Sequence, residues 1–244
     1  MKPLIFRAFH LAQLDKRSRK FPWGQYLSPG HKVKVEVVTN RKSKIYHAGA
    51  AIERIERAIS EELGAPLATS MDEAEIIIKT RIDDNNVMFS IDTSGVGLHK
   101  RGHKQAMGKA PLRETMASLL LRSCNYTGDE PVFDPMCGSG TLIIEAAEIA
   151  RHLMPGRSRR FAFEKLASDD VDAVQSIKSA WQTSPTQQKF YGSDRNVNVI
   201  RMAHENAARS GVDDICEFRP IPLSSIERPD GPPGLVVVNP PYGE

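Results

Sequence analysis

The residues of this sequence best suited to chemistry are Asn239 and Pro240, which follow the hydrophobic run 234–238. The exocyclic amine of a nucleobase is a poor nucleophile, because its lone pair is delocalised into the ring. Two acceptors aimed at its N–H groups, the Asn239 side-chain carbonyl and the Pro240 backbone carbonyl, favour a more tetrahedral nitrogen that localises this pair. The prolines fix the backbone through their locked φ angles, and Tyr242 is placed to stack on an extruded base. An ordinary proline-rich turn is the alternative.

A second candidate site is the glycine-containing loop Asp-Pro-Met-Cys-Gly-Ser-Gly-Thr at residues 134–141. Glycines after a strand let the backbone approach a ligand closely, and the helix that follows presents free N–H groups. Only Gly138 and Gly140 occur, so the pattern is not the GxGxxG of dinucleotide enzymes, and a structural tight turn remains an alternative. Further along, Asp194 ends a predicted strand, where it can accept hydrogen bonds from a ribose diol or cap the next helix.

These motifs follow strands that alternate with helices. The expected strands are 131–133, 189–194, 215–218 and 234–238, and the expected helices are 112–123, 141–152 and 196–210. Such alternation is typical of a parallel sheet. Ligands of such sheets bind at the carboxyl ends of the strands, which is where all three motifs lie.

The first half of the chain is predicted to be a compact mixed module with a basic loop at 40–44. We expect strands at 32–38, 75–82 and 87–92, a turn at 84–86 and an amphipathic helix at 48–63 that Gly64 ends. The stretch from Gly95 to Pro111 is rich in Gly, Lys and His and is predicted to be a linker.

Composition sets broad limits. The chain has 244 residues, 40% hydrophobic and 26% charged, with neither a membrane-spanning run nor a signal peptide, so a cytoplasmic location is the default expectation. The three cysteines form no CxxC pair, and His99 and His103 lie outside a helix, so no metal site is predicted. The net charge of +3 is small, but basic residues cluster before residue 50 and at 100–109. This clustering favours a phosphate-backbone partner, with a solvated basic face as the alternative.

Together, the 134–141 loop, the sequence Gly192-Ser193-Asp194 and the sequence Asn239-Pro240-Pro241-Tyr242 resemble the class I S-adenosylmethionine-dependent methyltransferases. The basic segment 40–47 and the stretch 102–115 resemble the THUMP and linker signatures of enzymes that join such a domain to an N-terminal THUMP module. The bacterial ribosomal-RNA guanine-N2 methyltransferases are of this kind. The Asn-Pro-Pro-Tyr motif also occurs in DNA-adenine and protein-glutamine methyltransferases, so only the THUMP-like half points to RNA.

The resemblance implies an α/β fold in which a THUMP-like α+β RNA-binding module, residues 1–95, is joined by a linker, 96–111, to a partial Rossmann-like methyltransferase domain, 112–244. The implied reaction is methyl transfer from S-adenosylmethionine to the N2 amino group of a guanine in ribosomal RNA, expected to be that of the large subunit, without a metal. Adenine-N6 methylation of DNA or RNA, or a non-catalytic RNA-binding fragment, are the alternatives.

The resemblance also assigns roles. Asp134, Gly138 and Gly140 would border the methionine part of the cofactor, Asp194 would hold the ribose, and the Asn-Pro-Pro-Tyr motif would hold the target base. The complete predicted sets are catalytic Asn239, Pro240 and Tyr242; cofactor-binding Asp134, Met136, Cys137, Gly138, Gly140, Thr141, Asp194, Arg195 and Asn196; and RNA-binding Arg41, Lys42, Lys44, Tyr46, Arg101 and Lys104.

Three further expectations follow. Cys137 is predicted to be a small filler in the loop, although a helix N-terminus can lower a thiol pKa and make it reactive. The stretch 218–224 lacks the acid that contacts the adenine amino group in many such enzymes, so either Ser224 or a backbone carbonyl replaces it, or cofactor affinity is weaker. The methyltransferase half supplies about four of the seven strands that the resemblance implies, so the 244-residue chain alone is expected to show weak or no turnover and to associate or aggregate.

Overall fold

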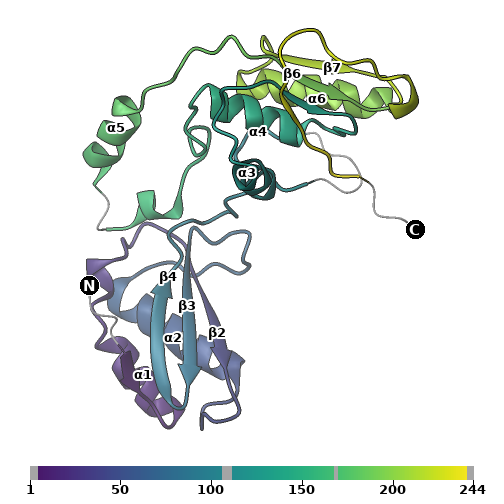
Figure 1. Ribbon diagram of the computed structural model, residues 1–244. Helices are drawn as coiled ribbons and strands as arrows, with labels where there is room; N and C mark the ends of the chain where they lie inside the picture. The colour runs from purple at the N-terminus through teal and green to yellow at the C-terminus, as the bar shows by residue number, and fades with distance from the viewer. Residues whose placement is uncertain (1–4, 106–111, 168–169, 241–244) are drawn as a thin grey trace. The chain divides into compact units, whose positions relative to one another are not determined.

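A computed structural model of the chain describes residues 5–105, 112–167 and 170–240 (Figure 1). The chain forms two compact units, each with its own hydrophobic core. The first unit comprises Met1–Val96 together with Arg160–Ala173, and the second comprises Gly97–Arg159 together with Val174–Glu244. This division differs from the predicted domain boundaries mainly at residues 160–173, which lie within the predicted methyltransferase domain but belong to the first unit.

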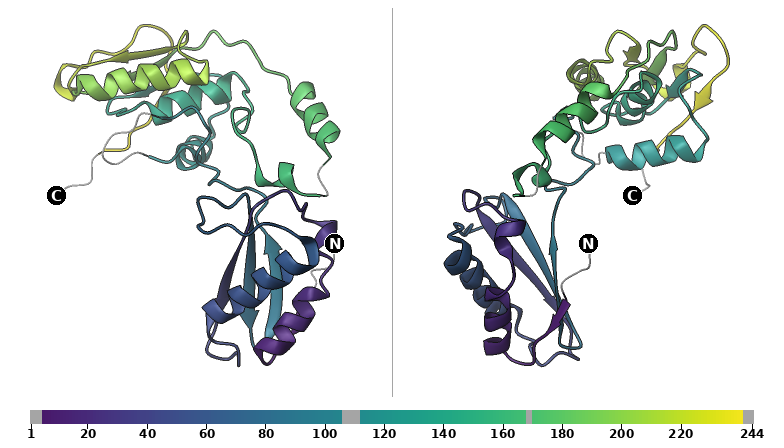
Figure 2. Two further views of the ribbon diagram at one scale, coloured as in Figure 1. Left: turned by 180° about the vertical axis from the view of Figure 1, so that it is seen from behind. Right: turned by 90° about the vertical axis from the view of Figure 1, so that its left-hand side faces the viewer.

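The first unit is a four-stranded sheet covered on one face by two helices, as Figure 2 shows. The strand order is β1-β4-β3-β2, with β2 and β3 parallel and the other neighbours antiparallel. The elements are β1 (Ile5–Arg7), α1 (Leu11–Arg19), β2 (Val33–Thr39), α2 (Ala48–Leu63), β3 (Ile76–Asp83) and β4 (Asn86–Ile91).

Local sequence explains most of this unit. In β3, buried Ile76, Ile78 and Ile82 alternate with more exposed residues, because successive side chains of a strand point to opposite faces. The helix α2 ends at Gly64, whose φ of 72° is the left-handed conformation of a C-cap, as predicted. The β3–β4 turn places Asp84 and the following asparagine at positive φ, which these residue types tolerate, so the predicted turn is also confirmed.

Among the strands and α-helices, β1, α1 and the helix α5 (Val171–Ala180) were not predicted from the sequence. The segment 160–167, which includes a short 3-10 helix at Ala162–Lys165, packs into the first unit. There Ala167 N–H donates to the Tyr26 carbonyl over 2.9 Å, and Leu166 packs against the core. These contacts are tertiary, so no local periodicity marks the segment.

The second unit is the predicted parallel sheet with helices. Its elements are α3 (Glu114–Ser123), β5 (Val132–Asp134), α4 (Thr141–Ala150), β6 (Phe190–Ser193), α6 (Val197–Ser210), β7 (Cys216–Arg219) and β8 (Leu235–Val236). The strand order is β7-β6-β5-β8, and all neighbours are parallel. The order of connection reverses between β5 and β8, which creates the topological switch point where α/β proteins bind ligands.

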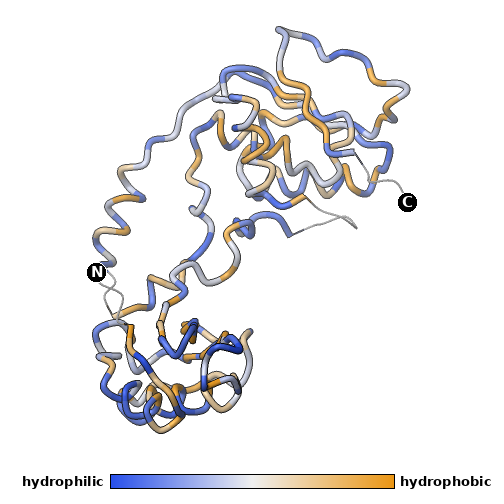
Figure 3. The backbone as a smooth tube through the Cα atoms, turned by 60° about the horizontal axis from the view of Figure 1, so that its bottom comes forward, coloured by the Kyte–Doolittle hydropathy of each residue, from blue (hydrophilic) through white to orange (hydrophobic). Residues whose placement is uncertain are grey.

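The helix α4 is the centre of the second core. Its residues from Thr141 to Glu148 are all buried, and Ile143 packs with Val132 of β5 and Phe190 of β6. Figure 3 shows that hydrophobic residues recur in short runs within both units, between hydrophilic segments. Among the helices of the described residues, none combines the length and apolar character needed to cross a membrane.

Candidate functional site

The loop between β5 and α4, residues 135–140, contains two glycines at positive φ. Gly140 has a φ of 84°, and a Cβ there would lie 3.0 Å from Ala203 Cβ and from a carbon of the Phe218 ring. Gly138 has a φ of 54°, but a Cβ there would meet no atom within 4 Å. Gly140 is therefore required for close packing, whereas the bare Cα of Gly138 faces open space that a ligand can approach.

Two carboxylates anchor this loop from neighbouring strands. Asp134, at the end of β5, accepts a hydrogen bond from Met136 N–H over 2.9 Å. Asp194, just beyond β6, accepts from Gly138 N–H over 3.2 Å and from Asn196 N–H over 2.9 Å. The N-cap of α6 is Asn196, whose side chain accepts from Asn198 N–H. The structure therefore decides against Asp194 as the helix cap and leaves its carboxylate at the loop.

Burial shapes the electrostatics of the site. Asp134 is 2% exposed, and this burial, reinforced by the charge of Asp194, raises its pKa to about 7, against the opposing hydrogen bond from Met136. The thiol of Cys137 is also buried, and burial together with the charges of Asp134 and Asp194 raises its pKa above the ordinary value. The neighbouring carboxylates thus oppose thiolate formation, which fits the predicted role of Cys137 as a filler.

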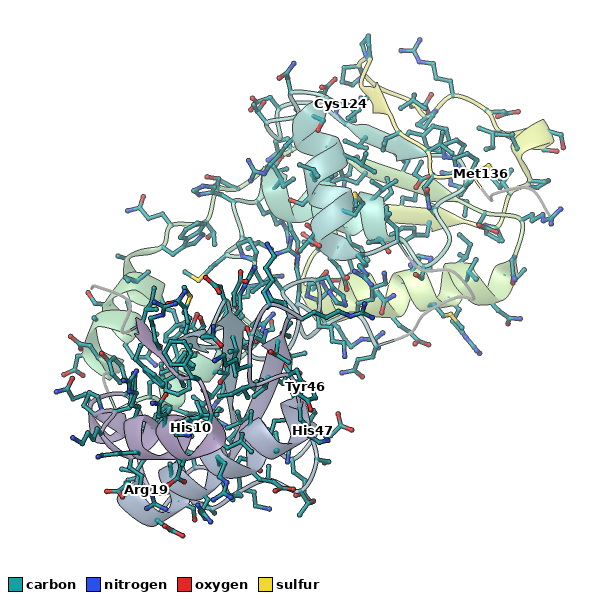
Figure 4. The ribbon with its side chains drawn as sticks, turned by 90° about the horizontal axis from the view of Figure 1, so that it is seen from below. His10, Arg19, Tyr46, His47, Cys124 and Met136 are labelled. Carbon is teal, nitrogen blue, oxygen red and sulfur yellow. The ribbon has the colours of Figure 1, made fainter. Side chains whose placement is uncertain are left out.

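The predicted cofactor residues lie on the loop and on the β6–α6 connection. Cys137 N–H donates to the Ser193 carbonyl over 2.9 Å, which joins the loop to the end of β6. Met136 is half-buried in the second unit (Figure 4), and Thr141 is buried as the first residue of α4. Arg195 and Asn196 are exposed immediately before α6. All nine predicted residues lie within the described part of the chain, and hydrogen bonds connect the two motifs.

The predicted catalytic motif follows β8, the strand beside β5. The two strands are parallel, with Phe133 opposite Val236, and Val237 N–H donates to the Phe133 carbonyl over 3.0 Å. The chain therefore leaves β8 on the same side of the sheet as the glycine loop leaves β5. Asn239 is half-buried and Pro240 is exposed there. The predicted base-stacking residue Tyr242 lies outside the described residues.

The stretch after β7 has no carboxylate between residues 218 and 224, as the sequence shows. The preceding acid, Glu217, pairs with Arg219. The Arg219 carbonyl accepts from Asp194 N–H over 3.3 Å, and Ser224 is exposed in a 3-10 helix at Leu223–Ser225. Ser224 or a backbone carbonyl as the replacement for the acid stays a prediction.

The basic loop of the first unit has alternating inner and outer residues. Ser43 is buried and donates to the Ile82 carbonyl over 3.3 Å, and Ile45 is buried in the core. Because these two residues anchor the loop, their neighbours are turned outward, and Tyr46 is 76% exposed. The outward residues are the four predicted RNA-binding residues Arg41, Lys42, Lys44 and Tyr46.

An aromatic ring that the sequence analysis did not identify belongs to this surface. The Lys44 ammonium lies 5.7 Å from the centre of the Phe9 ring, and the Arg7 guanidinium lies 5.3 Å from it. Figure 4 shows Tyr46 and His47 next to each other at the start of α2. Phe9 lies in the connection between β1 and α1, which was not predicted. In the sequence, the aromatic residue type of Phe9 is therefore the only feature that could have indicated a role in this surface.

Arg101 and Lys104, the other two predicted RNA-binding residues, are placed differently. Arg101 is 7% exposed and forms a two-pronged ion pair with Glu145 of α4, with N–O distances of 2.6 and 2.8 Å. Lys104 is half-buried and donates to the Leu112 carbonyl over 2.7 Å. Both side chains bind groups of the second unit. The buried placement of Arg101 does not fit the predicted role in RNA binding, and the half-buried placement of Lys104 fits that role poorly.

The buried histidine of this segment, His103, lies beside an acid of α4. His103 is 3% exposed, and burial lowers its pKa to about 4, aided by the charges of Arg157 and Arg101. Its Nε2 lies 3.7 Å from Glu148. Within the described ranges, no group of three or more His, Cys, Asp or Glu side chains is arranged to hold a metal ion.

The parallel sheet with the order β7-β6-β5-β8, the glycine loop after β5, the acid after β6 and the Asn-Pro after β8 together define a class I methyltransferase fold. The chain belongs to the RMKL-like methyltransferase domain family, whose model matches residues 101–244.

Known proteins resemble the chain beyond that domain. It is 38% identical over 193 residues to "Ribosomal RNA large subunit methyltransferase K/L" of Vibrio parahaemolyticus serotype O3:K6, a match that covers 75% of this chain but only 27% of the relative. A crystal structure described as a predicted N6-adenine-specific DNA methylase from Listeria monocytogenes matches 98% of this chain and 64% of that one, with 30% identity and a TM-score of 0.76. SMU.472, solved in complex with SAH, matches 98% of this chain and 65% of that one, with 27% identity and a TM-score of 0.79.

Proposed function

We propose that this chain binds S-adenosylmethionine at the loop after β5 and transfers its methyl group to the exocyclic N2 amine of a guanine in ribosomal RNA. The observation that carries the proposal is the parallel pairing of β5 with β8, which brings the glycine loop and Asn239 out at the same edge of the sheet. The large-subunit methyltransferase K/L relative supports the ribosomal substrate, and the SAH complex of SMU.472 supports the cofactor.

The loop has features that suit this cofactor. The open space at Gly138 is a cradle that a side chain would occupy, so backbone N–H groups and a ligand can come close there. The Asp194 carboxylate accepts one hydrogen bond from the loop, at Gly138, and one from Asn196 before α6, and it retains acceptor capacity for a ribose diol. Asp134 lies at the same loop, where an ionised carboxylate favours a positively charged ligand.

The chemistry asked of the protein is positioning and polarisation of the amine. The bound cofactor supplies an electrophilic methyl group on a sulfonium. With the cofactor bound, the amine nitrogen would take up this methyl as the carbon–sulfur bond gives its electron pair to sulfur, and the nitrogen would lose a proton to solvent. The Asn239 side-chain carbonyl and the Pro240 carbonyl accept the N–H groups, and Tyr242 stacks on the base. Correct placement and preorganised acceptors supply most of the rate.

We further propose that the outward residues of the basic loop, Arg41, Lys42, Lys44 and Tyr46, bind RNA together with Phe9. Cations and exposed aromatic rings on one surface suit a backbone contact combined with base stacking. The anchoring of this loop by Ser43 and Ile45 presents these side chains at low conformational cost. Arg101 is not included, because it is buried in its pair with Glu145.

The test is incubation of the chain with methyl-labelled S-adenosylmethionine and ribosomal RNA that lacks the modification, followed by nucleoside analysis. Labelled N2-methylguanosine is the expected product. Labelled N6-methyladenosine would instead support the second candidate, adenine-N6 methylation, which the description of the Listeria protein favours. Cofactor binding without any labelled nucleoside would leave an RNA-binding fragment as the better description and would overturn the proposed activity.

A further inference from the structure

Asn206 of α6 is a fully buried polar residue beside the glycine loop. Its exposed fraction is 0%, and its side-chain Nδ2 donates to the Ser139 carbonyl over 3.2 Å. One turn earlier on the same helix, Ala203 packs against Gly140. Residues three apart lie on one face of a helix, so this face of α6 supports the loop at two successive residues.

Arg209 fixes which way the Asn206 amide points. Its guanidinium donates to Asn206 Oδ1 over 2.6 Å and, through Nε, to the His103 carbonyl over 2.8 Å. A guanidinium has donors only, so the amide oxygen must face Arg209 and the amide nitrogen must face Ser139. The amide is thereby held in the one orientation that gives the loop a donor.

The loop needs such a donor because of its glycines. The peptide between Ser139 and Gly140 precedes a residue at a φ of 84°, and glycine populates several backbone conformations at similar cost. Elsewhere in the loop, the N–H groups of Gly138 and Cys137 donate to Asp194 and to the Ser193 carbonyl, and the Pro135 carbonyl accepts from Ser193 Oγ over 3.4 Å. Asn206 holds the Ser139 carbonyl, next to the second glycine, and so it fixes the rotation of the Ser139–Gly140 peptide.

We propose that Asn206 is a positioning residue for the cofactor, that it acts by orienting the Ser139–Gly140 peptide, and that Arg209 acts through it. This inference rests on the proposed cofactor site at the loop. Because Arg209 also binds the His103 carbonyl, the same network ties the segment before α3 to that site.

The experiment measures the affinity of the 244-residue chain for S-adenosylhomocysteine by calorimetry. Asn206→Asp keeps the shape but places a carboxylate oxygen against the Ser139 carbonyl, and it should weaken binding at least about tenfold. Arg209→Gln frees the amide to flip and should weaken binding about three- to tenfold. The matched control is Asn125→Asp, the same substitution at an exposed residue of the same unit, which should bind within about twofold of the original chain.

A double-mutant cycle separates positioning from general loss of structure. Because Arg209 acts through Asn206, adding Arg209→Gln to Asn206→Asp should weaken binding no further. The proposal would be overturned if the two single losses of affinity multiplied in the double variant. It would also be overturned if either single variant bound within about twofold of the original chain. Should Asn206→Asp fail to unfold cooperatively, the partly exposed Arg209 variant decides alone. Absence of binding by the original chain would instead remove the proposed cofactor site, and this inference with it.

Discussion

The Asp194 carboxylate accepts a hydrogen bond from the backbone N–H of Gly138 over 3.2 Å, so the acid after β6 is joined directly to the glycine loop after β5. Its second oxygen accepts from Asn196 N–H at the start of α6. One side chain therefore fixes both backbone segments that the proposed cofactor would contact. A substitution that leaves no acceptor at Asp194 would therefore remove the proposed ligand for the ribose and an anchor of the loop together.

Asp194→Ala should accordingly weaken binding of S-adenosylhomocysteine by about tenfold or more, since it removes charge-assisted hydrogen bonds worth about 1.5–3 kcal/mol each. Asp194→Asn should lose less, because the amide oxygen still accepts one of the two N–H groups. Calorimetry measures both, with Asp213→Ala at an exposed site of the same unit as the control. Unchanged affinity in Asp194→Ala would contradict the assigned role.

Cofactor affinity should depend on pH through Asp134. Burial raises the pKa of this carboxyl to about 7, so below that pH it is mostly protonated in the folded chain. A sulfonium ligand favours the ionised form, and binding of S-adenosylmethionine should therefore strengthen about three- to tenfold from pH 6 to pH 8. The uncharged sulfur of S-adenosylhomocysteine should give a smaller change.

Asp134→Asn is the control for this pH dependence, because the ligand's own titration persists in that variant. In this variant, the affinities for S-adenosylmethionine and S-adenosylhomocysteine should depend on pH in the same way. The pH dependence of folding stability has the opposite sign to that of cofactor binding. Because the pKa of the Asp134 carboxyl is raised in the folded chain, its contribution to stability is present below the unfolded pKa near 3.8 and is lost as pH rises through about 7. Thermal unfolding should show Asp134→Asn gaining stability relative to the original chain from pH 5 to pH 8.

The pair of Arg101 with Glu145 should act on stability and not on RNA. Both side chains are almost completely buried, so Arg101→Ala leaves an uncompensated carboxyl and should cost about 3 kcal/mol of unfolding free energy. Burial already raises the pKa of Glu145 to about 7, so this loss should be smaller at pH 6, where the unpaired carboxyl is protonated, than at pH 8.

Urea unfolding checks this prediction, with Arg201→Ala as the control because Arg201 is 71% exposed on α6. RNA affinity of the folded Arg101 variant should stay within about twofold of the original chain. A large loss of RNA affinity with unchanged unfolding free energy would restore the RNA role predicted from the sequence.

RNA binding should depend on salt through the basic loop. Each phosphate contact that is removed lowers the slope of log affinity against log salt by about 0.7–0.9. Lys42→Ala and Lys44→Ala should each flatten the slope by about this amount. Lys20, an exposed cation at the far end of α1, provides the control. The slopes are measured by filter binding across a salt series. Equal slopes for the loop variants and the control would count against the basic loop as an RNA-binding surface.

Asn239→Ala should remove methyl transfer while it leaves binding of S-adenosylhomocysteine within about twofold, because the side chain acts on the amine and not on the cofactor. The label-transfer assay and calorimetry provide the two readouts. Turnover retained in this variant would refute the assignment of Asn239 as an acceptor for the amine.

Much of the site was predicted from local sequence alone. A strand, a turn and a helix each depend on residues that lie close together in the chain, so the order of β5, α4, β6, α6, β7 and β8 and the motifs at their ends could be predicted. The basic loop at 40–44 was predicted for the same reason, although its outward side chains and the buried anchors Ser43 and Ile45 only appeared in the structure.

The tertiary structure decided which charges are available and which segments belong together. Arg101 meets Glu145 across 44 positions, Asn206 meets Ser139 across 67, and Lys165 of the segment 160–167 meets Glu75 across 90. A basic residue in a glycine-rich stretch has the same sequence signal whether it faces RNA or a buried carboxylate. The physical reason is that burial and pairing are set by partners distant in the chain, which no local periodicity encodes.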